Sequence, residues 1–268
     1  MHASTVRPPR GSEWVKGYAL VCDSTGGVTL MKSKVYESFD AAVADIADGS
    51  TIMFSGFAGP GTPRNLIAAL LAQGASGLTV ISNTPGSWGD GPIDLKALID
   101  AGRVRRVVAA FTAATHPSMR RAFDELYEAG EIEAELVPQG TLAERIRAGG
   151  AGIGAFYTPT GVGTETAEGK EVRSFEGRDY VLELPLRADY AMLRAHRADE
   201  MGNLQYVHTQ RNFGPIMARA ARTTLAELDG PVAAAGEIDP NQVHTPGIFV
   251  DRMVVVPADG IQEGARGG

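Results

Sequence analysis

The sequence is poor in cysteine: Cys22 is the only one among 268 residues. A single thiol cannot form an internal disulfide or build a cysteine-based zinc site. The five histidines show no HxxxH or HExxH spacing, so no zinc-hydrolase motif is present. We therefore expect no metal ion at the functional site. A chain with one thiol suits a reducing compartment, and we expect the protein to be cytoplasmic.

Long apolar runs and clustered positive charge are also lacking. No apolar run approaches the roughly 20 residues that span a bilayer, and Tyr18–Cys22 is too short for a signal-peptide core. The net charge is -7, and the densest basic group consists of Arg103, Arg105 and Arg106. A general nucleic-acid or anionic-membrane binder needs a clustered excess of Lys and Arg. We therefore expect neither a nucleic acid nor a membrane as partner.

What the chain does contain is typical of a soluble globular protein, with 44% hydrophobic and 21% charged residues. Residues 1–33 include Pro8-Pro9 and several glycines with weak periodicity, so we expect a flexible N-terminal arm there. We assign residues 34–258 to one domain. Residues 259–268 are expected to form a frayed tail.

From Ser38 onwards, short β-rich runs alternate with helical patterns. The expected strands are Thr51–Phe54, Leu78–Ile81, Val104–Phe111, Glu131–Val137 and Val250–Val256. The expected helices are Ser38–Ala47, one beginning at Pro63, Ile93–Ala101, Ser118–Ala129 and Thr141–Arg147. This alternation predicts an α/β fold with an open, mostly parallel sheet. Glu171–Phe175 and Tyr180–Leu184 flank Glu176-Gly177 and predict a hairpin, hence an antiparallel portion.

The most informative segment runs from Asp48 to Pro63, where a turn separates an expected strand from an expected helix. The turn residues that we single out are Gly56, Phe57, Gly59 and Gly61. Glycine lets the backbone approach a ligand closely, and N–H groups near a helix N-terminus favour an anionic oxygen. The spacing is neither GxGxxG nor a P-loop. A tight turn that binds no ligand is the competing interpretation.

Two further turns follow expected strands at the same edge of the sheet. Asn83 lies in the turn 82–86, and Gln139 and Gly140 lie in the turn 137–140. Ligands in open α/β sheets bind at the carboxyl ends of the strands, so these residues are candidates to surround one substrate. Each is alternatively an ordinary turn or cap residue. The glycine-rich segments 149–154 and 158–164 predict either an extended ligand wall or close backbone packing.

Candidate nucleophiles are scarce in the sequence. There is no GxSxG elbow of the kind found in serine hydrolases. Glu165 and Glu168 border a glycine-rich segment and are the carboxylates whose position best suits a nucleophile. Nothing near them in sequence would desolvate them, so we interpret both as solvated loop acids.

Together these blocks resemble the A subunit of family I CoA-transferases, from about residue 34 to residue 256. Asp48–Pro63 matches that family's signature except at Ser55, where glycine is usual. The other similar blocks are Leu136–Gly154, Thr158–Thr164, Ala167–Glu171, Tyr180–Asp189 and Arg211–Pro215. Within the family, the last two of these blocks are most similar to the 3-oxoadipate type and less so to the acetoacetate type.

Three departures from the family pattern lie near the expected substrate end. Thr84-Pro85 replaces the second Asn and the Ala of a family loop, and Ala58 stands where glycine is common. The segment Trp88–Leu95 is longer than usual. These departures bear on which acid is the substrate more than on the reaction type.

The resemblance implies a NagB/RpiA-like fold and a B-subunit partner, commonly in an α2β2 heterotetramer. It implies transfer of CoA from succinyl-CoA to a 3-oxo acid through a glutamyl-CoA intermediate on the B subunit. CoA is then a substrate, no cofactor is needed, and this chain supplies no catalytic nucleophile. The backbone around Gly56–Gly61, with Asn83 and Gln139, is expected to hold the acyl group. The favoured 3-oxo acid is 3-oxoadipate. The alternatives are an acetoacetate-type 3-oxoacid CoA-transferase subunit, a CoA-thioester hydrolase, a sugar-phosphate isomerase or sensor, and a purely structural subunit.

Overall fold

The computed structural model describes residues 18–22, 28–87, 92–112 and 121–257, and its central element is a seven-stranded sheet. The strands of this sheet are β3 (Thr51–Phe54), β4 (Leu78–Ser82), β5 (Val104–Ala109), β6 (Glu133–Leu136), β10 (Ala188–Ala195), β13 (Ala221–Leu228) and β15 (Arg252–Val255). Their order is β15-β13-β10-β3-β4-β5-β6. Every neighbouring pair is parallel.

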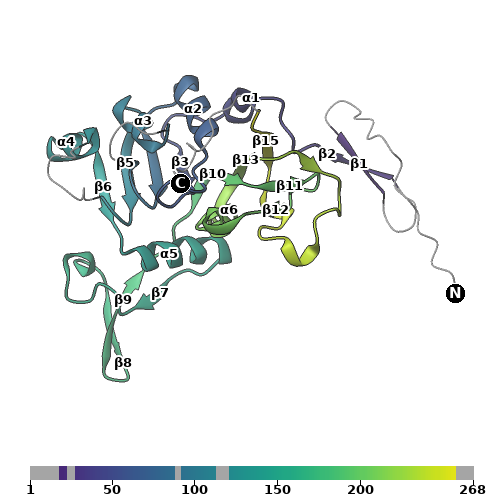
Figure 1. Ribbon diagram of the computed structural model, residues 1–268. Coiled ribbons are helices and arrows are strands. Elements are labelled where there is room, and N and C mark those ends of the chain that lie inside the picture. The colour runs from purple at the N-terminus through teal and green to yellow at the C-terminus, as the bar shows by residue number, and fades with distance from the viewer. Residues whose placement is uncertain (1–17, 23–27, 88–91, 113–120, 258–268) are drawn as a thin grey trace, which may run out of the picture.

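Helices cover both faces of this sheet (Figure 1). On one face lie α1 (Phe39–Val43), α2 (Arg64–Gln73) and α3 (Leu95–Asp100), with α4 (Ala122–Glu128) beside α3. On the other lie α5 (Gln139–Ala151) and α6 (Gly214–Ala220). Strand β3 shows the alternation, because Ile52 and Phe54 pack into the first core and Met53 into the second. Burial on both faces explains the apolar run of the central strand β3.

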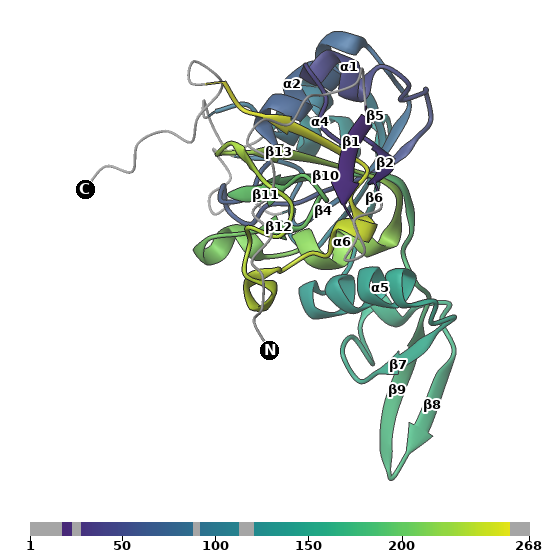
Figure 2. The same cartoon turned by 90° about the vertical axis from the view of Figure 1, so that its right-hand side faces the viewer.

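Small sheets with antiparallel pairs lie beside the parallel sheet. Strands β7 (Phe156–Thr158), β9 (Arg178–Glu183) and β8 (Val172–Phe175) form a sheet that projects from the body below α5 (Figures 1 and 2). Its β8-β9 pair is the expected hairpin, and it belongs to this separate sheet. Strands β11 (Arg197–Asp199), β12 (Leu204–Gln205) and β14 (Val232–Ala233) form another.

The segment 1–33 contains a strand pair that its weak periodicity did not indicate. Strand β1 (Tyr18–Cys22) pairs antiparallel with β2 (Val28–Lys32). The expected tail 259–268 lies outside the described residues. None of the described helices is long and apolar enough to cross a membrane.

Strands β10 and β13 and helix α6 were not predicted, and helix α5 is longer than predicted. It begins two residues earlier than predicted, at Gln139, and ends four residues later, at Ala151. Gly149 and Gly150 therefore lie in its last turn, where a Cβ added to Gly149 would be 1.9 Å from the Leu186 carbonyl oxygen and one added to Gly150 would be 2.7 Å from the Arg219 Cβ on α6. For these two glycines the interpretation as a ligand wall is wrong, and the interpretation as close packing is confirmed.

The strand order reverses between β3 and β10. The chain continues from β3 to β4 on one side, whereas β10 is followed by β13 on the other. Such a switch point leaves room at the carboxyl ends of the strands, and ligands of open α/β sheets bind there. The turns after β3 and β4, which carry Gly56 and Asn83, are therefore placed where a ligand is expected.

Candidate functional site

Residues 55–62, which we call the glycine loop, connect β3 to α2 and form one wall of the site. Gly56, Gly59 and Gly61 have φ values of 123°, 107° and 80°. Ala58 has a φ of 50°, a conformation that costs a residue with a Cβ about 1 kcal/mol. The loop thus needs positive φ at four positions, and the sequence supplies glycine at three of them.

Ser55 ties the two ends of the glycine loop together. Its Oγ donates to the Gly61 carbonyl oxygen at 2.6 Å and accepts from the Arg194 backbone N–H at 3.4 Å. The side chain is buried, so these contacts satisfy a hydroxyl that would otherwise be costly to bury. The departure from the family signature therefore adds a hydrogen bond that closes the loop.

Asn212 fixes the glycine loop from a segment 156 residues away in the sequence. Its Oδ1 accepts from the Gly56 N–H at 3.1 Å, and its Nδ2 donates to the Pro60 carbonyl oxygen at 3.1 Å. A Cβ added to Gly61 would lie 2.7 Å from this Nδ2, so the loop packs tightly against Asn212. The block Arg211–Pro215 was singled out by resemblance alone, and its contact with the loop is new information from the fold.

Two of the N–H groups expected to face a ligand are used inside the protein. The Gly56 N–H donates to Asn212, and the Phe57 N–H donates to the Pro60 carbonyl oxygen at 3.1 Å. The N–H groups of Ala58 and Gly59 donate to no acceptor in the described part of the chain, and both residues line a cavity. Within the glycine loop, the candidate N–H donors to this cavity are therefore those of Ala58 and Gly59.

The structure brings Asn83 and Gln139 together. The Gln139 Nε2 donates to the Asn83 Oδ1 at 2.6 Å. The backbone carbonyl oxygen of Asn83 accepts from the backbone N–H groups of Ala110 and Phe111, at 3.1 and 3.2 Å. These two bonds fix the Asn83 backbone against the end of β5. This pattern presents the Asn83 Nδ2 as a donor and the Gln139 Oε1 as an acceptor. Gln139 is the first residue of α5, so its predicted place in a turn is corrected to a helix N-terminus.

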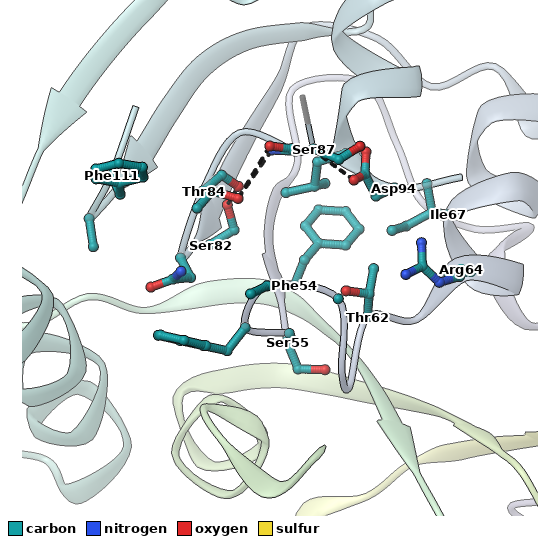
Figure 3. A pocket seen from close by; sticks show the side chains of 18 of the residues that line it. Phe54, Ser55, Thr62, Arg64, Ile67, Ser82, Thr84, Ser87, Asp94 and Phe111 are labelled. Carbon is teal, nitrogen blue, oxygen red and sulfur yellow. Dashed lines mark hydrogen bonds between the residues drawn. The ribbon is translucent and has the colours of Figure 1, made fainter. Parts of the chain in front are cut away.

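A cavity of about 750 Å³ lies between the glycine loop, the turn after β4 and the residues before α3 (Figure 3). Its volume is typical of small-molecule sites. The lining is largely apolar and includes Phe54, Phe57, Ile67, Leu95, Ala110 and Phe111. Asn83 and Gln139 also line it, together with the glycine loop. Gly56, Phe57 and Gly59 of the glycine loop therefore share one cavity with Asn83 and Gln139.

The charged residues among the described lining are Arg64 and Asp94, and no sequence motif indicated either of them. Arg64 directly follows Pro63 and is the first residue of α2. Asp94 is the N-cap of α3, where its carboxylate accepts from the Lys96 and Ser87 N–H groups at 2.9 and 2.8 Å. Asp94 lay inside the expected helix Ile93–Ala101, and the available signal was that Asp is a preferred N-cap residue close to the start of that helix.

Some residues singled out in the sequence lie away from this cavity. Gly61 packs against Asn212, and Gly140 lies in the first turn of α5; neither is among the described lining residues. Glu165 and Glu168 are exposed, which agrees with their interpretation as solvated acids. The segment 158–164 does not contribute to the described lining either.

Glu227 of β13 lies buried beneath the start of α2. Its carboxylate accepts from the backbone N–H groups of Asn65 and Leu66 at 2.8 and 3.1 Å, and the Arg194 Nε lies 3.7 Å away. Burial raises the pKa of Glu227 to about 7, although the N–H groups and Arg194 act in the opposite direction. Glu227 therefore anchors the helix that follows the glycine loop, and no sequence motif indicated it.

Comparison with known sequences gives a consistent result. The A subunit of the 3-oxoadipate CoA-transferase from Pseudomonas putida is 55% identical over 226 residues, which cover 84% of this chain and 95% of that protein. The A subunit of the succinyl-CoA:3-ketoacid coenzyme A transferase from Xanthomonas campestris is 48% identical, covering 83% of this chain and 89% of that protein.

Similar folds are found among solved structures. A cysteine-to-serine variant of the decarboxylase AibA/AibB has a TM-score of 0.70 at 27% identity and covers 88% of each chain. Glutaconate coenzyme A-transferase from Acidaminococcus fermentans has a TM-score of 0.72 at 22% identity, covering 84% of this chain and 76% of that one. The sequence profile of the Coenzyme A transferase family matches residues 36–256. This chain therefore belongs to the Coenzyme A transferase family.

Proposed function

We propose that this chain is the A subunit of a CoA-transferase that moves CoA from succinyl-CoA to 3-oxoadipate. The observation that carries the proposal is the 55% identity to a protein named as the A subunit of 3-oxoadipate CoA-transferase, over 95% of its length. That name implies a B-subunit partner, and we propose an α2β2 heterotetramer in the cytoplasm. The cavity beside the glycine loop supports the proposal, because it offers neutral donors suited to an acyl group.

The proposed reaction is a double displacement on a carboxylate of the B subunit. That carboxylate attacks the thioester carbonyl of succinyl-CoA, the C–S bond breaks, and a mixed anhydride and CoA thiolate result. The thiolate then attacks the glutamyl carbonyl, which releases succinate and leaves a glutamyl-CoA thioester. The 3-oxo acid reverses these two steps and leaves as its CoA thioester. CoA is a substrate throughout, and the proposed route uses no cofactor.

This chain's part is to stabilise the charge that develops on the acyl oxygen in each step. The Asn83 Nδ2 and the N–H groups of Ala58 and Gly59 are the candidate donors, and Gln139 holds the Asn83 amide in place. A donor that faces a developing oxyanion contributes on the order of 3 kcal/mol to transition-state stabilisation. Because the backbone of Asn83 is fixed by β5, the donor is positioned before the substrate binds.

The chemistry of the cavity supports placing the nucleophile on the partner. Asp94 is the carboxylate among the described lining residues, and each of its oxygens accepts a backbone N–H. These bonds stabilise the anion and make it a poor nucleophile. Glu165 and Glu168 are exposed and lie away from the lining.

A second candidate function keeps the fold and changes the chemistry. The AibA/AibB decarboxylase resembles this chain at 27% identity over 88% of each chain, so the fold alone does not select transfer. Hydrolysis of a CoA thioester is a further alternative on this fold. The three reactions differ in their products. Transfer gives the CoA thioester of the acceptor acid, decarboxylation gives CO2, and hydrolysis gives free CoA.

The test is a steady-state assay of the chain assembled with its B subunit. With succinyl-CoA as donor, we expect ping-pong kinetics and a higher kcat/KM for 3-oxoadipate than for acetoacetate. A preference for acetoacetate would overturn the substrate assignment and leave the reaction class intact. Release of CO2, or of free CoA without the CoA thioester of the 3-oxo acid, would overturn the reaction class.

A further inference from the structure

The tip of the glycine loop, residues 57–59, adopts a conformation that depends on support from other segments. Ala58 has a φ of 50°, and Gly59 has a φ of 107°. A residue with a Cβ keeps a positive φ only where its surroundings hold it there. Across the tip, the Phe57 N–H donates to the Pro60 carbonyl oxygen at 3.1 Å. This bond closes the turn but does not fix how the tip is oriented towards the cavity.

Asn212 bonds to the backbone on both sides of the tip. Its Oδ1 accepts from the Gly56 N–H and its Nδ2 donates to the Pro60 carbonyl oxygen, each at 3.1 Å. Gly56 precedes the tip and Pro60 follows it, so one side-chain amide spans the three residues between them. The Pro60 carbonyl oxygen is also the acceptor of the Phe57 N–H. The bond inside the turn and the bond to Asn212 therefore meet at one atom.

The Asn212 amide is itself held by the body of the protein. Its Nδ2 also donates to the carbonyl oxygens of Thr209 and Gln210, at 2.8 and 3.1 Å. The Gln210 side chain is buried, and its Nε2 donates to the carboxylate of Asp229 at 2.8 Å, directly after β13. Phe213, the next residue after Asn212, is buried in the core between α6 and the sheet. Asn212 is therefore fixed independently of the glycine loop and can hold the loop in place.

The backbone N–H groups of Ala58 and Gly59 are the donors that this arrangement leaves for a ligand. Neither donates to an acceptor in the described part of the chain, and both residues line the cavity that contains Asn83 and Gln139. Preorganised N–H groups stabilise a developing oxyanion because they need no reorganisation when the charge appears. A residue that fixes the tip therefore bears on the chemistry, although Asn212 is not among the described lining residues.

We propose that Asn212 is a positioning residue, which holds the tip of the glycine loop so that the N–H groups of Ala58 and Gly59 meet the oxyanion of the acyl group. The inference rests on the proposed function and assigns a role to a residue outside the cavity lining. A displacement of reacting groups by about 1 Å costs on the order of 100-fold in rate. Because the oxyanion develops in the transition state, the loss should appear in kcat more than in KM.

The kinetic test compares Asn212→Ala with Asn203→Ala in the enzyme assembled with its B subunit. Asn203 is a matched control, because it is half-buried like Asn212, its Oδ1 accepts from the Gly247 N–H at 2.8 Å, and it lies outside the described cavity lining. Both variants lose an amide that holds a glycine N–H, so both should be less stable than the wild type. For Asn212→Ala we expect kcat to fall about 10- to 100-fold while both KM values stay within about 3-fold. Asn203→Ala should keep the wild-type kcat.

Hydrogen–deuterium exchange gives a readout that does not depend on activity. In Asn212→Ala the Gly56 N–H loses its acceptor, so we expect peptides that span residues 55–62 to exchange about 3- to 10-fold faster at this position. The same peptides should exchange at the wild-type rate in Asn203→Ala.

Asn212→Asp is a second variant that keeps the shape of the side chain. It retains an acceptor for the Gly56 N–H but places a second oxygen against the Pro60 carbonyl oxygen, where the wild type has a donor. We expect its kcat to fall as well, because one side of the tip is no longer held. This variant decides the kinetic test if Asn212→Ala does not assemble with the B subunit.

The outcomes separate this inference from the proposed function. An unchanged kcat in either Asn212 variant would overturn the inference, and so would an equal loss of kcat in Asn203→Ala, because lower stability alone would then explain the effect. Unchanged exchange of residues 55–62 in Asn212→Ala would show that Asn212 does not hold the tip. Failure of the unaltered enzyme to transfer CoA to any 3-oxo acid would instead overturn the proposed function.

Discussion

At the scale of single residues, the Asn83–Gln139 pair is the feature whose removal should affect catalysis most directly. Asn83→Ala removes the side-chain donor at the acyl oxygen, so we expect kcat to fall by about 10²- to 10³-fold. Gln139→Ala should cost less, because its Nε2 acts by holding the Asn83 Oδ1. The double variant should be no worse than Asn83→Ala, since residues that act as a unit are not additive.

Steady-state kinetics of the assembled enzyme checks this prediction, with Gly140→Ala as the control. Gly140 is in the same turn of α5 as Gln139, and a Cβ there would meet nothing within 4 Å. Full activity of Asn83→Ala in an assembled enzyme would favour a purely structural role for this chain.

Glu227 gives a prediction about pH. Its folded pKa is raised to about 7 from a usual 4.5, so the folded state binds its proton more tightly than the unfolded state does. The stability from Glu227 is then fully present below about pH 4.5 and is lost as the pH rises to about 7. We expect the free energy of unfolding of the wild type, relative to Glu227→Gln, to fall by roughly 3 kcal/mol over this range. Urea unfolding at several pH values measures it, and a difference that is constant with pH would contradict the assigned pKa.

These residues also show what the sequence could reveal about the site. Asn83 and Gln139 were predictable because each follows an expected strand of one parallel sheet, and the family resemblance pointed to the same two. Asn212 and Glu227 were not singled out for a role in the site, because their roles depend on contacts between distant segments. The Gly56 contact of Asn212, for example, joins residues 156 positions apart.

At the scale of elements, the last turn of α5 has a glycine that packing requires. Gly149→Ala would place a Cβ 1.9 Å from the Leu186 carbonyl oxygen, so backbone must move. We expect a loss of about 1–3 kcal/mol or more in the free energy of unfolding. In contrast, Gly140→Ala in the first turn of the same helix should be neutral or stabilising by up to about 1 kcal/mol. Thermal unfolding of both variants tests the pair, and equal effects would contradict the described packing of α5.

Periodicity predicted many of the elements, but not strands β10 and β13 or helix α6. Strand β3 has the expected bounds, and α2 begins one residue after Pro63. The full length of α5 was not predicted, because Gly149 and Gly150 are read as helix breakers when their tertiary packing is unknown. The pair β1-β2 was missed for the related reason that a short hairpin has little periodicity to detect.

At the scale of the whole molecule, the proposed function makes this chain one part of a catalytic unit whose nucleophile lies on a partner. The parallel sheet brings the glycine loop, Asn83 and Gln139 to one cavity, yet the carboxylate among its described lining residues caps a helix. A cavity that offers hydrogen-bond donors but no free carboxylate among its described lining residues suits a subunit that positions the acyl group. The nucleophile that attacks this group would then come from the partner subunit. The sequence predicted this division of labour only through the family resemblance, since no property of one chain reveals what a second chain supplies.

Covalent trapping of the CoA intermediate tests the central claim most directly. This chain, its B-subunit partner and their mixture would each be incubated with succinyl-CoA, treated with borohydride or hydroxylamine, and analysed by peptide mass spectrometry. We predict a trapped glutamate only in the mixture, located on the B subunit, and no turnover by this chain alone. A label on Glu165, Glu168 or Asp94, or transfer by this chain without its partner, would contradict the account.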